Sequence, residues 1–525
     1  MIPLISTQCA YVFALVTIYL RWDTVFLQAL FNTKYVIMTS MQHHSSQKRQ
    51  LIVRFLVYGL MTTSVVVIVS ILMLVILGYS FNRTDGRIEQ GGLLQFATTP
   101  SGARVTLDEA ALPTRTPTKS SVSASSHAVK MELADYRAWH KTANVRAGSI
   151  VWLSYARLIP NEVKTESLRD FPTLTGALAS SDRRWMLLQT EAGSSSMLLA
   201  NLQNKAVEYT TLTLPNDILT AAASEAPSTI SLETWSGDNR FALLKRTYDT
   251  SKVEWLILDR ADPTKSVNVT TSFGVDASKV IFGDNNGRTL FIRTDDIVRK
   301  VNLDDQTLSR PLVTNVDDFS VFKDETVVYS TKLDATEKRH VGYVREDMKA
   351  PQTIETYDND GLQLRMAFGE YYGVRYVAIV HGTSLDIVKG TLPHDADKGE
   401  LTVVSKQTVP GDVQKLGITR SGRFVVAQSP DSHLVYDIEL RRADETKFTK
   451  PTTAARELHW LDDYVLWSDR GDMLRFLEFD GANQQDIMPV AEGFSVTLSS
   501  DNKYVYGIVR TDKGFALSRG TLILN

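Results

Sequence analysis

The chain is poor in cysteine, with a single one, Cys9, among its 525 residues. A small scaffold stapled by disulfides is therefore excluded, as is a cysteine-based metal site, and stability must come from a large apolar core. Lysine and arginine number 57 against 60 acidic residues, a net charge of −3. Because no basic run occurs outside the flank of the hydrophobic segment described below, we expect no nucleic-acid partner.

Motifs of catalysis are also missing. The sequence has no Gly-x-Ser-x-Gly elbow, no His-Glu-x-x-His pair and no Walker loop. Paired aspartates lack the alternating oxygen ligands of a calcium loop and are typical of hairpin turns. Histidines of the C-terminal region are scattered, and we expect packed or surface positions for them: His340, His381, His394, His433 and His459. We therefore predict no catalytic residue, no metal site and no cofactor.

One long segment lacks charge. From Phe55 to Tyr79 no acid or base occurs over 25 residues, which is enough to cross a bilayer. A buried core helix is the alternative, but such helices rarely stay apolar on every face. We predict a transmembrane helix over residues 51–79, with the lipid bilayer as its partner. The flanking charges are Lys48, Arg49 and Arg54 before it, and Arg83 and Arg87 offset by Asp85 and Glu89 after it.

This charge asymmetry predicts a cytoplasmic segment over residues 1–50 and an extracytoplasmic bulk. Residues 10–20 are apolar but too short to span, and no lysine or arginine precedes Arg21, as a signal peptide would require. This stretch could instead form half of a helical hairpin or be left untranslated. We expect residues 1–37 to be untranslated, with a start at Met38 or Met41. Residues 80–90, rich in charge and glycine, predict a linker.

Residues 91–158 alternate between apolar and polar side chains, as Val105, Leu107 and the stretch 127–133 show. This period of two predicts a small antiparallel β-domain. Its turn residues Pro100-Ser101-Gly102-Ala103, followed by Thr116-Pro117, Tyr136-Arg137 and Val145 to Gly148, resemble a PEGA domain. Proline and glycine suit a tight turn here, so these residues predict architecture.

Two positions depart from the PEGA pattern. Ser101 stands where the family has glutamate, and Glu109 stands where a glycine follows the Leu-Asp pair. The second departure predicts a longer turn after Asp108. The resemblance implies a bacterial-type, envelope-facing binding or spacer module.

From residue 160 to 525 one theme recurs, a polar turn followed by two hydrophobic strands. Eight copies begin near residues 180, 236, 283, 322, 368, 420, 461 and 499. A repeat of this length with four strands predicts a β-propeller, so the chain is mainly β, with eight blades expected and seven as the alternative. The turns near 180, 420 and 499 are similar to those of TolB-like and WD40-like propellers. The strand that completes the last blade is expected from residues 149–157 or 163–168.

Two functions fit this organisation. The first is a non-enzymatic, single-pass surface protein whose propeller binds an envelope protein or glycan. Exposed aromatics near turns are candidate contacts, although packing between blades is the commoner role for any one of them: Trp235, Tyr371, Tyr372 and Trp460. The alternative is a hydrolase or lyase with carboxylates in the central channel, which a convergent pair of perturbed acids would favour. A sensory or assembly role through the cytoplasmic segment is a further option.

Overall fold

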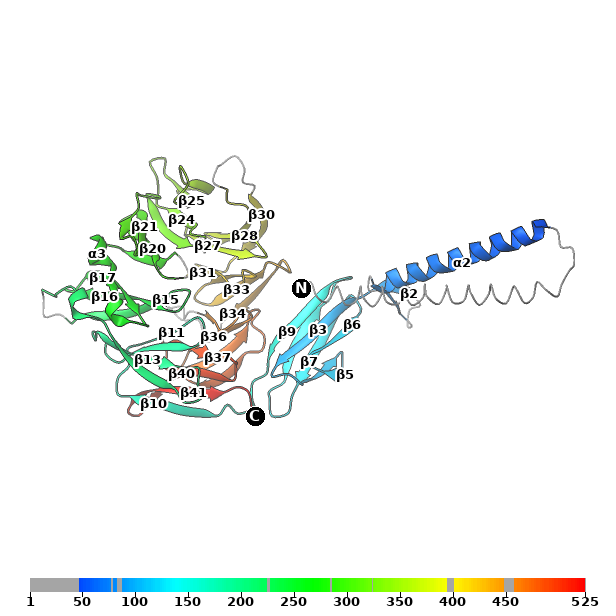
Figure 1. Ribbon diagram of the computed structural model, residues 1–525, viewed down its shortest axis with the longest axis horizontal. Helices are drawn as coiled ribbons and strands as arrows, with labels where there is room; N and C mark the ends of the chain where they lie inside the picture. Colours follow the sequence, from blue (N-terminus) through cyan, green and yellow to red (C-terminus); the bar gives the residue numbers. More distant parts are fainter. Residues whose placement is uncertain are drawn as a thin grey trace. The chain divides into compact units, whose positions relative to one another are not determined.

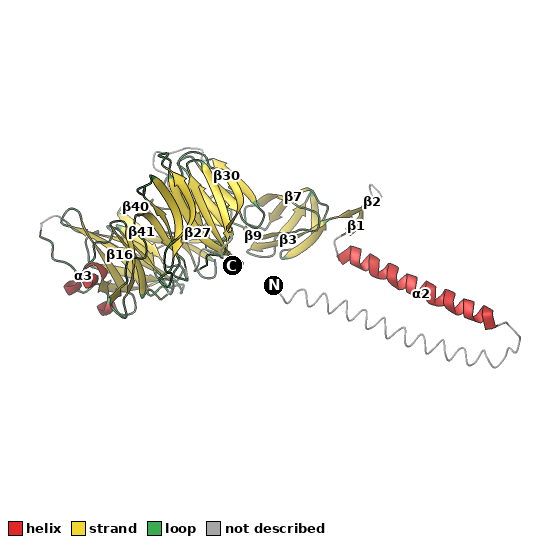
Figure 2. Cartoon of the chain, turned by 90° about the horizontal axis from the view of Figure 1, so that it is seen from above, coloured by secondary structure: helices red, strands yellow, loops and turns green. Residues whose placement is uncertain are grey.

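The computed structural model of the chain describes residues 47–76, 79–82, 87–223, 227–283, 286–322, 324–393, 401–447 and 458–524. Predictions about residues 1–46, including Cys9 and the start at Met38 or Met41, lie outside these ranges, as does His394. Strands dominate the described chain, as Figure 2 shows. The mainly β fold expected from the sequence is therefore confirmed.

The first described element is a long apolar helix, α2 (Gln47–Ile76). Its segment Ile52–Leu74 is exposed along its length and is long and apolar enough to cross a membrane. A two-stranded antiparallel sheet follows, formed by β1 (Tyr79–Asn82) and β2 (Arg87–Gln90). Within the predicted linker over 80–90, the described residues thus form paired strands. Sequence reasoning missed these strands because their residues do not alternate regularly between apolar and polar side chains.

The small β-domain (residues 91–158) consists of two sheets around one core. The strands are β3 (Gly92–Thr99), β4 (Arg104–Leu107), β5 (Ala110–Arg115), β6 (Thr118–Val122), β7 (Ser126–Glu132), β8 (Trp139–Asn144) and β9 (Ile150–Arg157). They pair in the orders β6-β3-β9 and β5-β4-β7-β8. Phe96, Met131 and Trp139 are among the fully buried side chains between the sheets. One pair, β3 with β9, is parallel. The sequence predicted an antiparallel domain, and this pair corrects that prediction. Alternation of apolar and polar residues reveals a strand but not the direction in which it pairs.

Two turns of this domain test the sequence predictions. Gly102 has a φ of +93°, a conformation that glycine adopts readily in a tight turn, and its N–H donates to the Thr116 carbonyl at 2.9 Å, which ties this turn to Thr116. Between β4 and β5 the turn has only two residues, Asp108 and Glu109, with φ of +46° and +70°. The longer turn predicted there is wrong, because Glu109 adopts the left-handed conformation that a glycine would take.

The propeller consists of eight four-stranded antiparallel sheets among the described residues, so the prediction of eight blades is confirmed. Figure 1 shows the blades following one another around a ring. Blades 1 to 4 are β11 (Gly176–Ala179), β12 (Trp185–Gln189), β13 (Ser196–Asn201) and β14 (Glu208–Thr213); β15 (Thr229–Trp235), β16 (Phe241–Tyr248), β17 (Lys252–Asp259) and β18 (Val267–Asn268); β19 (Lys279–Phe282), β20 (Thr289–Thr294), β21 (Ile297–Asn302) and β22 (Thr307–Leu308); and β23 (Val316–Val321), β24 (Val327–Thr331), β25 (Lys338–Val344) and β26 (Gln352–Asp358).

Blades 5 to 8 follow the same order. They are β27 (Leu364–Tyr371), β28 (Val374–His381), β29 (Ser384–Gly390) and β30 (Leu401–Thr408); β31 (Lys415–Ile418), β32 (Phe424–Gln428), β33 (Ser432–Asp437) and β34 (Arg442–Lys447); β35 (His459–Trp460), β36 (Val465–Ser468), β37 (Met473–Glu478) and β38 (Gln485–Pro489); and β39 (Thr497–Leu498), β40 (Tyr504–Thr511), β41 (Gly514–Thr521) and β10 (Thr165–Phe171). Short helices occur at η1 (Asn216–Ile218), η2 (Pro263–Lys265) and α3 (Val269–Phe273).

The last blade is completed by the first strand of the propeller. β10 pairs antiparallel with β41, with Ser167 opposite Ser518. Of the two sources expected for this strand, the prediction of residues 163–168 is confirmed, with the strand itself at Thr165–Phe171. Residues of the other candidate, 149–157, form β9 of the small β-domain. First strands of neighbouring blades, such as β11 and β15 or β27 and β31, contact one another and form the inner ring. Clusters of buried apolar residues fill the space between blades.

Ring closure predicts a specific disulfide. In a chain with Cys9 replaced by serine, Ser167→Cys with Ser518→Cys is expected to oxidise to an intramolecular bond, because directly opposed residues lie about 4.5–5.5 Å apart between Cβ atoms. The bond should raise the free energy of unfolding by about 2–4 kcal/mol. Ser167→Cys with Thr356→Cys, on an outer strand of blade 4, is the control. Cross-linking of the control pair but not of the opposed pair would contradict the closure.

A buried histidine predicts a pH dependence of stability. Burial lowers the pKa of His127, but hydrogen bonds to Asp108, at 2.5 Å, and to the Ser123 carbonyl outweigh it and raise the pKa overall. Because the folded-state pKa is the higher one, this stabilisation is fully present below about pH 6.5 and is lost as the pH rises through the folded-state value. The difference in melting temperature between wild type and His127→Gln should thus be larger at pH 5.5 than at pH 8.5. His140→Gln, at an exposed residue, serves as control, and an equal difference at both pH values refutes the pairing.

Candidate functional site

The loops of the propeller divide into two faces. Because the inner strands run in the same direction around the ring, every connection from first to second strand, and from third to fourth, lies on one face. We call this the turn face. It carries the recurring polar turns and the pocket that are described below.

A recurring turn joins the first two strands of four blades. A serine or threonine hydroxyl accepts a hydrogen bond, at 2.9–3.1 Å, from the backbone N–H five residues later. The acceptors are Ser180, Ser236, Thr419 and Ser499. In three of these turns an aspartate also accepts two hydrogen bonds, one from the serine hydroxyl and one from a backbone N–H. These aspartates are Asp182, Asp238 and Asp501. These repeated polar residues therefore build the turns, as the sequence predicted.

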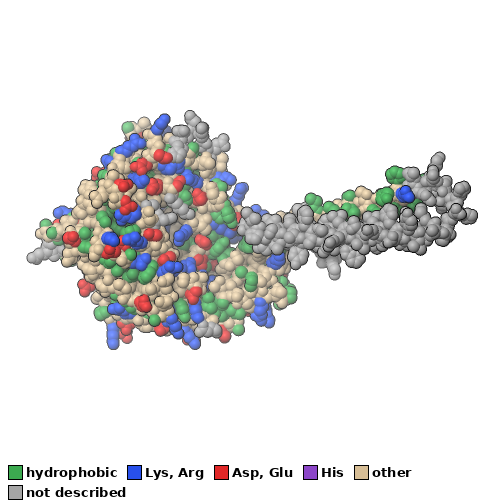
Figure 3. All heavy atoms as spheres, viewed as in Figure 1, with side chains coloured by type: hydrophobic (Ala, Val, Ile, Leu, Met, Phe, Trp, Pro, Cys, Tyr) green, Lys and Arg blue, Asp and Glu red, His purple; other side chains and the backbone are tan. Residues whose placement is uncertain are grey.

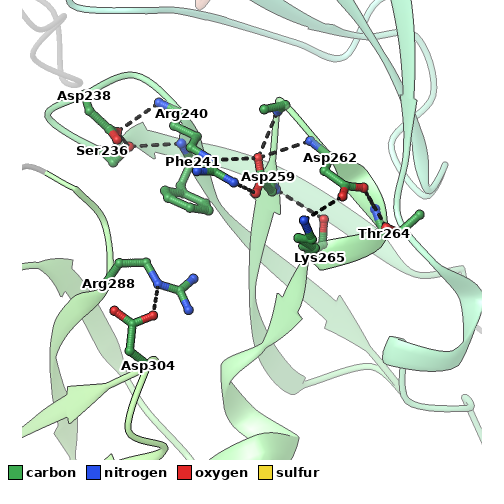
Figure 4. A network of polar contacts seen from close by, with 12 residues as sticks. Ser236, Asp238, Arg240, Phe241, Asp259, Asp262, Thr264, Lys265, Arg288 and Asp304 are labelled. Atoms are coloured by element: carbon green, nitrogen blue, oxygen red, sulfur yellow. Dashed lines mark hydrogen bonds and ion pairs between the residues drawn. The ribbon is translucent and has the colours of Figure 1, made fainter.

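An arginine ties the turn to the third strand of its blade. Figure 4 shows this in blade 2, where Arg240 follows Asp238 and makes two hydrogen bonds to Asp259, at 2.7 and 3.2 Å. Asp259 is 1% exposed. Burial alone would raise its pKa, but Arg240 and two backbone N–H groups lower it below the ordinary value. Equivalent ties are Arg288–Asp304 and Arg423–Asp437, both at 2.7 Å. Sequence reasoning missed these pairs, although an aspartate at or just after the end of the third strand is their signal.

Blade 7 holds the small β-domain through a buried ion cluster. Lys141 of β8 lies 2.6 Å from both Glu478, at the end of β37, and Asp480. Trp139 Nε1 donates to Glu478, and Asn483 Nδ2 donates to it at 3.0 Å. All three charged side chains are less than a tenth exposed. Burial raises the pKa of the Glu478 carboxyl, and Lys141 offsets this only in part.

Aromatic packing extends the same junction. Tyr155 of β9 stacks on Tyr464 with ring centroids 4.7 Å apart and meets Phe479 edge-on at 5.7 Å. Arg157 Nη2 lies 2.9 Å from Asp462, in the first turn of blade 7. Apolar contact and paired charge therefore fix the small β-domain on the turn face of blades 6 and 7.

An open pocket of about 560 Å³ lies between blades 4 and 5 on the turn face. Its charged lining residues are Asp324, Arg345, Asp347 and Arg375, and the remainder is Gly373 and residues 390–393. Arg375 pairs with Asp324, and Arg345 lies 3.9 Å from the same carboxylate. Burial raises the pKa of Asp324, but hydrogen bonds from Thr326 and the Arg375 charge outweigh it and lower the pKa overall.

The aromatic candidates separate into two groups. Trp235 is 8% exposed and donates to the Leu178 carbonyl, and Trp460 stacks on Phe424, so both pack between blades. Tyr372 is 75% exposed and directly precedes Gly373 of the pocket. Tyr371 lies against it with ring centroids 4.5 Å apart. Of the four candidates, Tyr372 is thus the one that the structure leaves largely exposed at the surface.

Comparison with known proteins assigns the small β-domain. Residues 92–158 match the PEGA domain family. This segment is a PEGA domain. A comparison with curated proteins finds no match for the chain.

Similar solved structures are propellers. An oligogalacturonate lyase in complex with manganese is 13% identical, with 69% of this chain and 98% of that chain covered and a TM-score of 0.37. The WD40 repeats of RRP9 are 11% identical over 69% and 100% of the two chains, with a TM-score of 0.37. Kluyveromyces lactis Hsv2 is 10% identical over 67% and 99%, with a TM-score of 0.35. The fold assignment itself rests on the sheet order and the closure by β10.

Among the residues that the structure describes, the charged groups of the inner ring and the histidines do not gather into one site. The first strands carry both signs of charge, and Lys279 pairs with Asp318 at 2.7 Å. Histidines occupy separate blades: His340 pairs with Asp334, His381 pairs with Asp360, His433 is buried with its pKa lowered to about 4 by desolvation, and His459 stacks on Trp467. Within the described ranges, no three histidine, cysteine or carboxylate side chains are arranged to hold a metal.

Removing the lysine of the junction should unpair two buried carboxylates. Lys141→Met is expected to lower the free energy of unfolding by about 3–5 kcal/mol at pH 8, whereas Lys130→Met, at an exposed pair, should change it by less than about 1 kcal/mol. Because the folded-state pKa of Glu478 lies above its unfolded value, the loss should shrink as the pH falls and the carboxyl is protonated. Urea unfolding of both variants at pH 5 and pH 8 measures this. A loss that is equal for both variants would show that the PEGA domain is not held by this cluster.

Proposed function

We propose that this protein is a single-pass, membrane-anchored binding protein, not an enzyme, whose propeller presents its turn face to a ligand of the cell envelope. The α2 helix anchors the chain, with its N-terminus in the cytoplasm and the PEGA domain and propeller outside. The PEGA domain acts as a spacer. The observation that carries this proposal is the open polar pocket between blades 4 and 5, together with the exposed Tyr372 in the turn that supplies Gly373 to its lining.

The distribution of charge supports a binding role. Among the described carboxyls, those whose pKa is raised overall, with burial as the main cause, are Glu478 and Asp444, on the third strand of blade 7 and the fourth strand of blade 6, and Glu478 is held by the PEGA domain. A channel hydrolase or lyase needs such acids on the inner strands. Figure 3 shows acidic and basic side chains interspersed over the visible face, which suits a protein or glycan better than nucleic acid.

Retention of envelope fractions tests this function. The full chain in lipid nanodiscs, carrying an affinity tag, is incubated with separated polysaccharide, peptidoglycan and membrane-protein pools. We expect saturable retention of one pool, and a loss of about tenfold in retention with Tyr372→Ala, because a central exposed aromatic carries much of the contact energy. Trp152→Ala, at an exposed tryptophan of the PEGA domain, should retain the pool as wild type does.

No retention of any pool would refute the binding function. The orientation is checked on the same chain in whole cells, where protease added outside should degrade the propeller. Protection of the propeller there would reverse the proposed topology.

A further inference from the structure

We propose that the PEGA domain itself contacts the lipid bilayer, through an apolar patch at the start of β9, so that the chain meets the membrane at a second place besides α2. This inference rests on the proposed anchoring by α2 and goes beyond it. Three observations carry it, namely the exposure of two large apolar side chains, their position at one end of a sheet and their short distance along the chain from the membrane span.

The patch lies on the outer face of the sheet β6-β3-β9. Among the residues of the PEGA domain, the large apolar side chains that are exposed are Ile150, at 51%, and Trp152, at 43%. Leu93 is the partner of Ile150 in the parallel pair of β3 and β9. Because Leu94 and Leu153 fill the core, their neighbours Leu93 and Trp152 point to the opposite face. We call Leu93, Ile150 and Trp152 the basal patch.

The outer face becomes polar away from this end. Gln95 lies opposite Trp152, and the exposed Ser154 follows Trp152 along β9. At the far end of β9, Tyr155 and Arg157 contact blade 7. One end of this strand is therefore docked on the propeller, and the exposed apolar side chains gather at the other end. Single exposed apolar residues are ordinary, but adjacent ones confined to one end of a domain indicate an apolar partner there.

The chain keeps the basal patch close to the membrane span. The uncharged segment ends at Tyr79, which is the partner of Gln90 in the two-stranded sheet after α2. The Gly91 carbonyl accepts a hydrogen bond from the Gly148 N–H at 2.8 Å, and Ile150 follows two residues later. Since consecutive Cα atoms are about 3.8 Å apart and paired ones about 5 Å, this route from Tyr79 to Ile150 is no longer than about 22 Å. The pairing thus returns the chain to the point where it leaves the span.

The membrane interface is the partner whose chemistry fits the basal patch. Tryptophan favours this zone because its ring packs on acyl chains while its N–H faces the headgroups. The exposed Arg146, in the loop that leads into β9, supplies a cation for lipid phosphates. A bilayer also lies beside every anchored copy, whereas another protein would have to be recruited. Contact at the basal patch would hold the PEGA domain against the bilayer and present the propeller at a fixed height.

Spin labelling of the full chain in nanodiscs tests the inference. In a chain with Cys9 replaced by serine, Ile150→Cys carries a nitroxide. Its relaxation by oxygen, which partitions into lipid, is compared with its relaxation by a nickel chelate, which stays in water. Val403→Cys, on the outer strand of blade 5, is the matched control because Val403 is also 51% exposed. We expect the ratio of oxygen to nickel relaxation at Ile150 to lie above that at Val403 and below that of Val66→Cys in α2, as for a side chain at headgroup depth.

A label at Gln95→Cys leaves the basal patch intact and tests its two large side chains. Introducing Ile150→Ser with Trp152→Ser should raise the nickel relaxation of this label, because polar side chains release the contact. The melting temperature should change little, since both residues are exposed. Nickel relaxation that stays the same in the double variant would contradict the contact.

The label in α2 separates this inference from the proposed anchoring. A ratio at Ile150 equal to that at Val403, with the Val66 label in lipid, would overturn the inference and leave the anchoring standing. A Val66 label that is open to the nickel chelate would refute the anchoring itself. Spin–spin broadening at Ile150 that disappears on dilution with unlabelled chain would assign the basal patch to a second copy of the chain and overturn the membrane contact.

Discussion

The pairing of β10 with β41 is the constraint on which the rest of the chain depends. Without β10 the eighth blade would have three strands, and β41 would present an open edge to other chains. The pairing joins residues more than three hundred positions apart, so the ring closes only when the whole propeller has formed. β10 also follows β9 of the PEGA domain after a short connection. The strand that closes the ring is therefore also the one to which the PEGA domain is joined in the chain.

The turn face then serves two purposes. Over blades 6 and 7 its charged and aromatic side chains are buried against the PEGA domain, where Lys141 satisfies two carboxylates at once. Over blades 4 and 5 the same kind of loops surround open space, and the charges there pair with one another across the pocket. Equivalent loops of one repeat architecture thus pack against the PEGA domain in one place and surround an open pocket in another. The repeated serine and aspartate turns supply the rigid frame for both.

Much of the fold followed from local sequence patterns. Each blade has a polar turn between its first and second strands, and serine, aspartate and glycine fit tight turns wherever they occur, so the count of eight followed from these turns. The PEGA domain followed from its turn residues. What sequence reasoning missed depends on tertiary contact, because nothing near Lys141 in the sequence indicates that Glu478 lies beside it. The same holds for the parallel pairing of β3 and β9 and for the pocket. Tyr372 was identified as one of four aromatics, and only its φ and exposure set it apart.

Hydrogen exchange of the full chain in nanodiscs is the most direct test of the closed ring with its docked PEGA domain. The amides of β10 that pair with β41, and those of β8 and β9 near the junction, are followed by mass spectrometry alongside the inner strands. We expect β10 to exchange as slowly as β40 and β41, and Lys141→Met to accelerate exchange at the junction while leaving β10 slow. Exchange of β10 at the rate of exposed loops, with β40 and β41 protected, would contradict the closed ring.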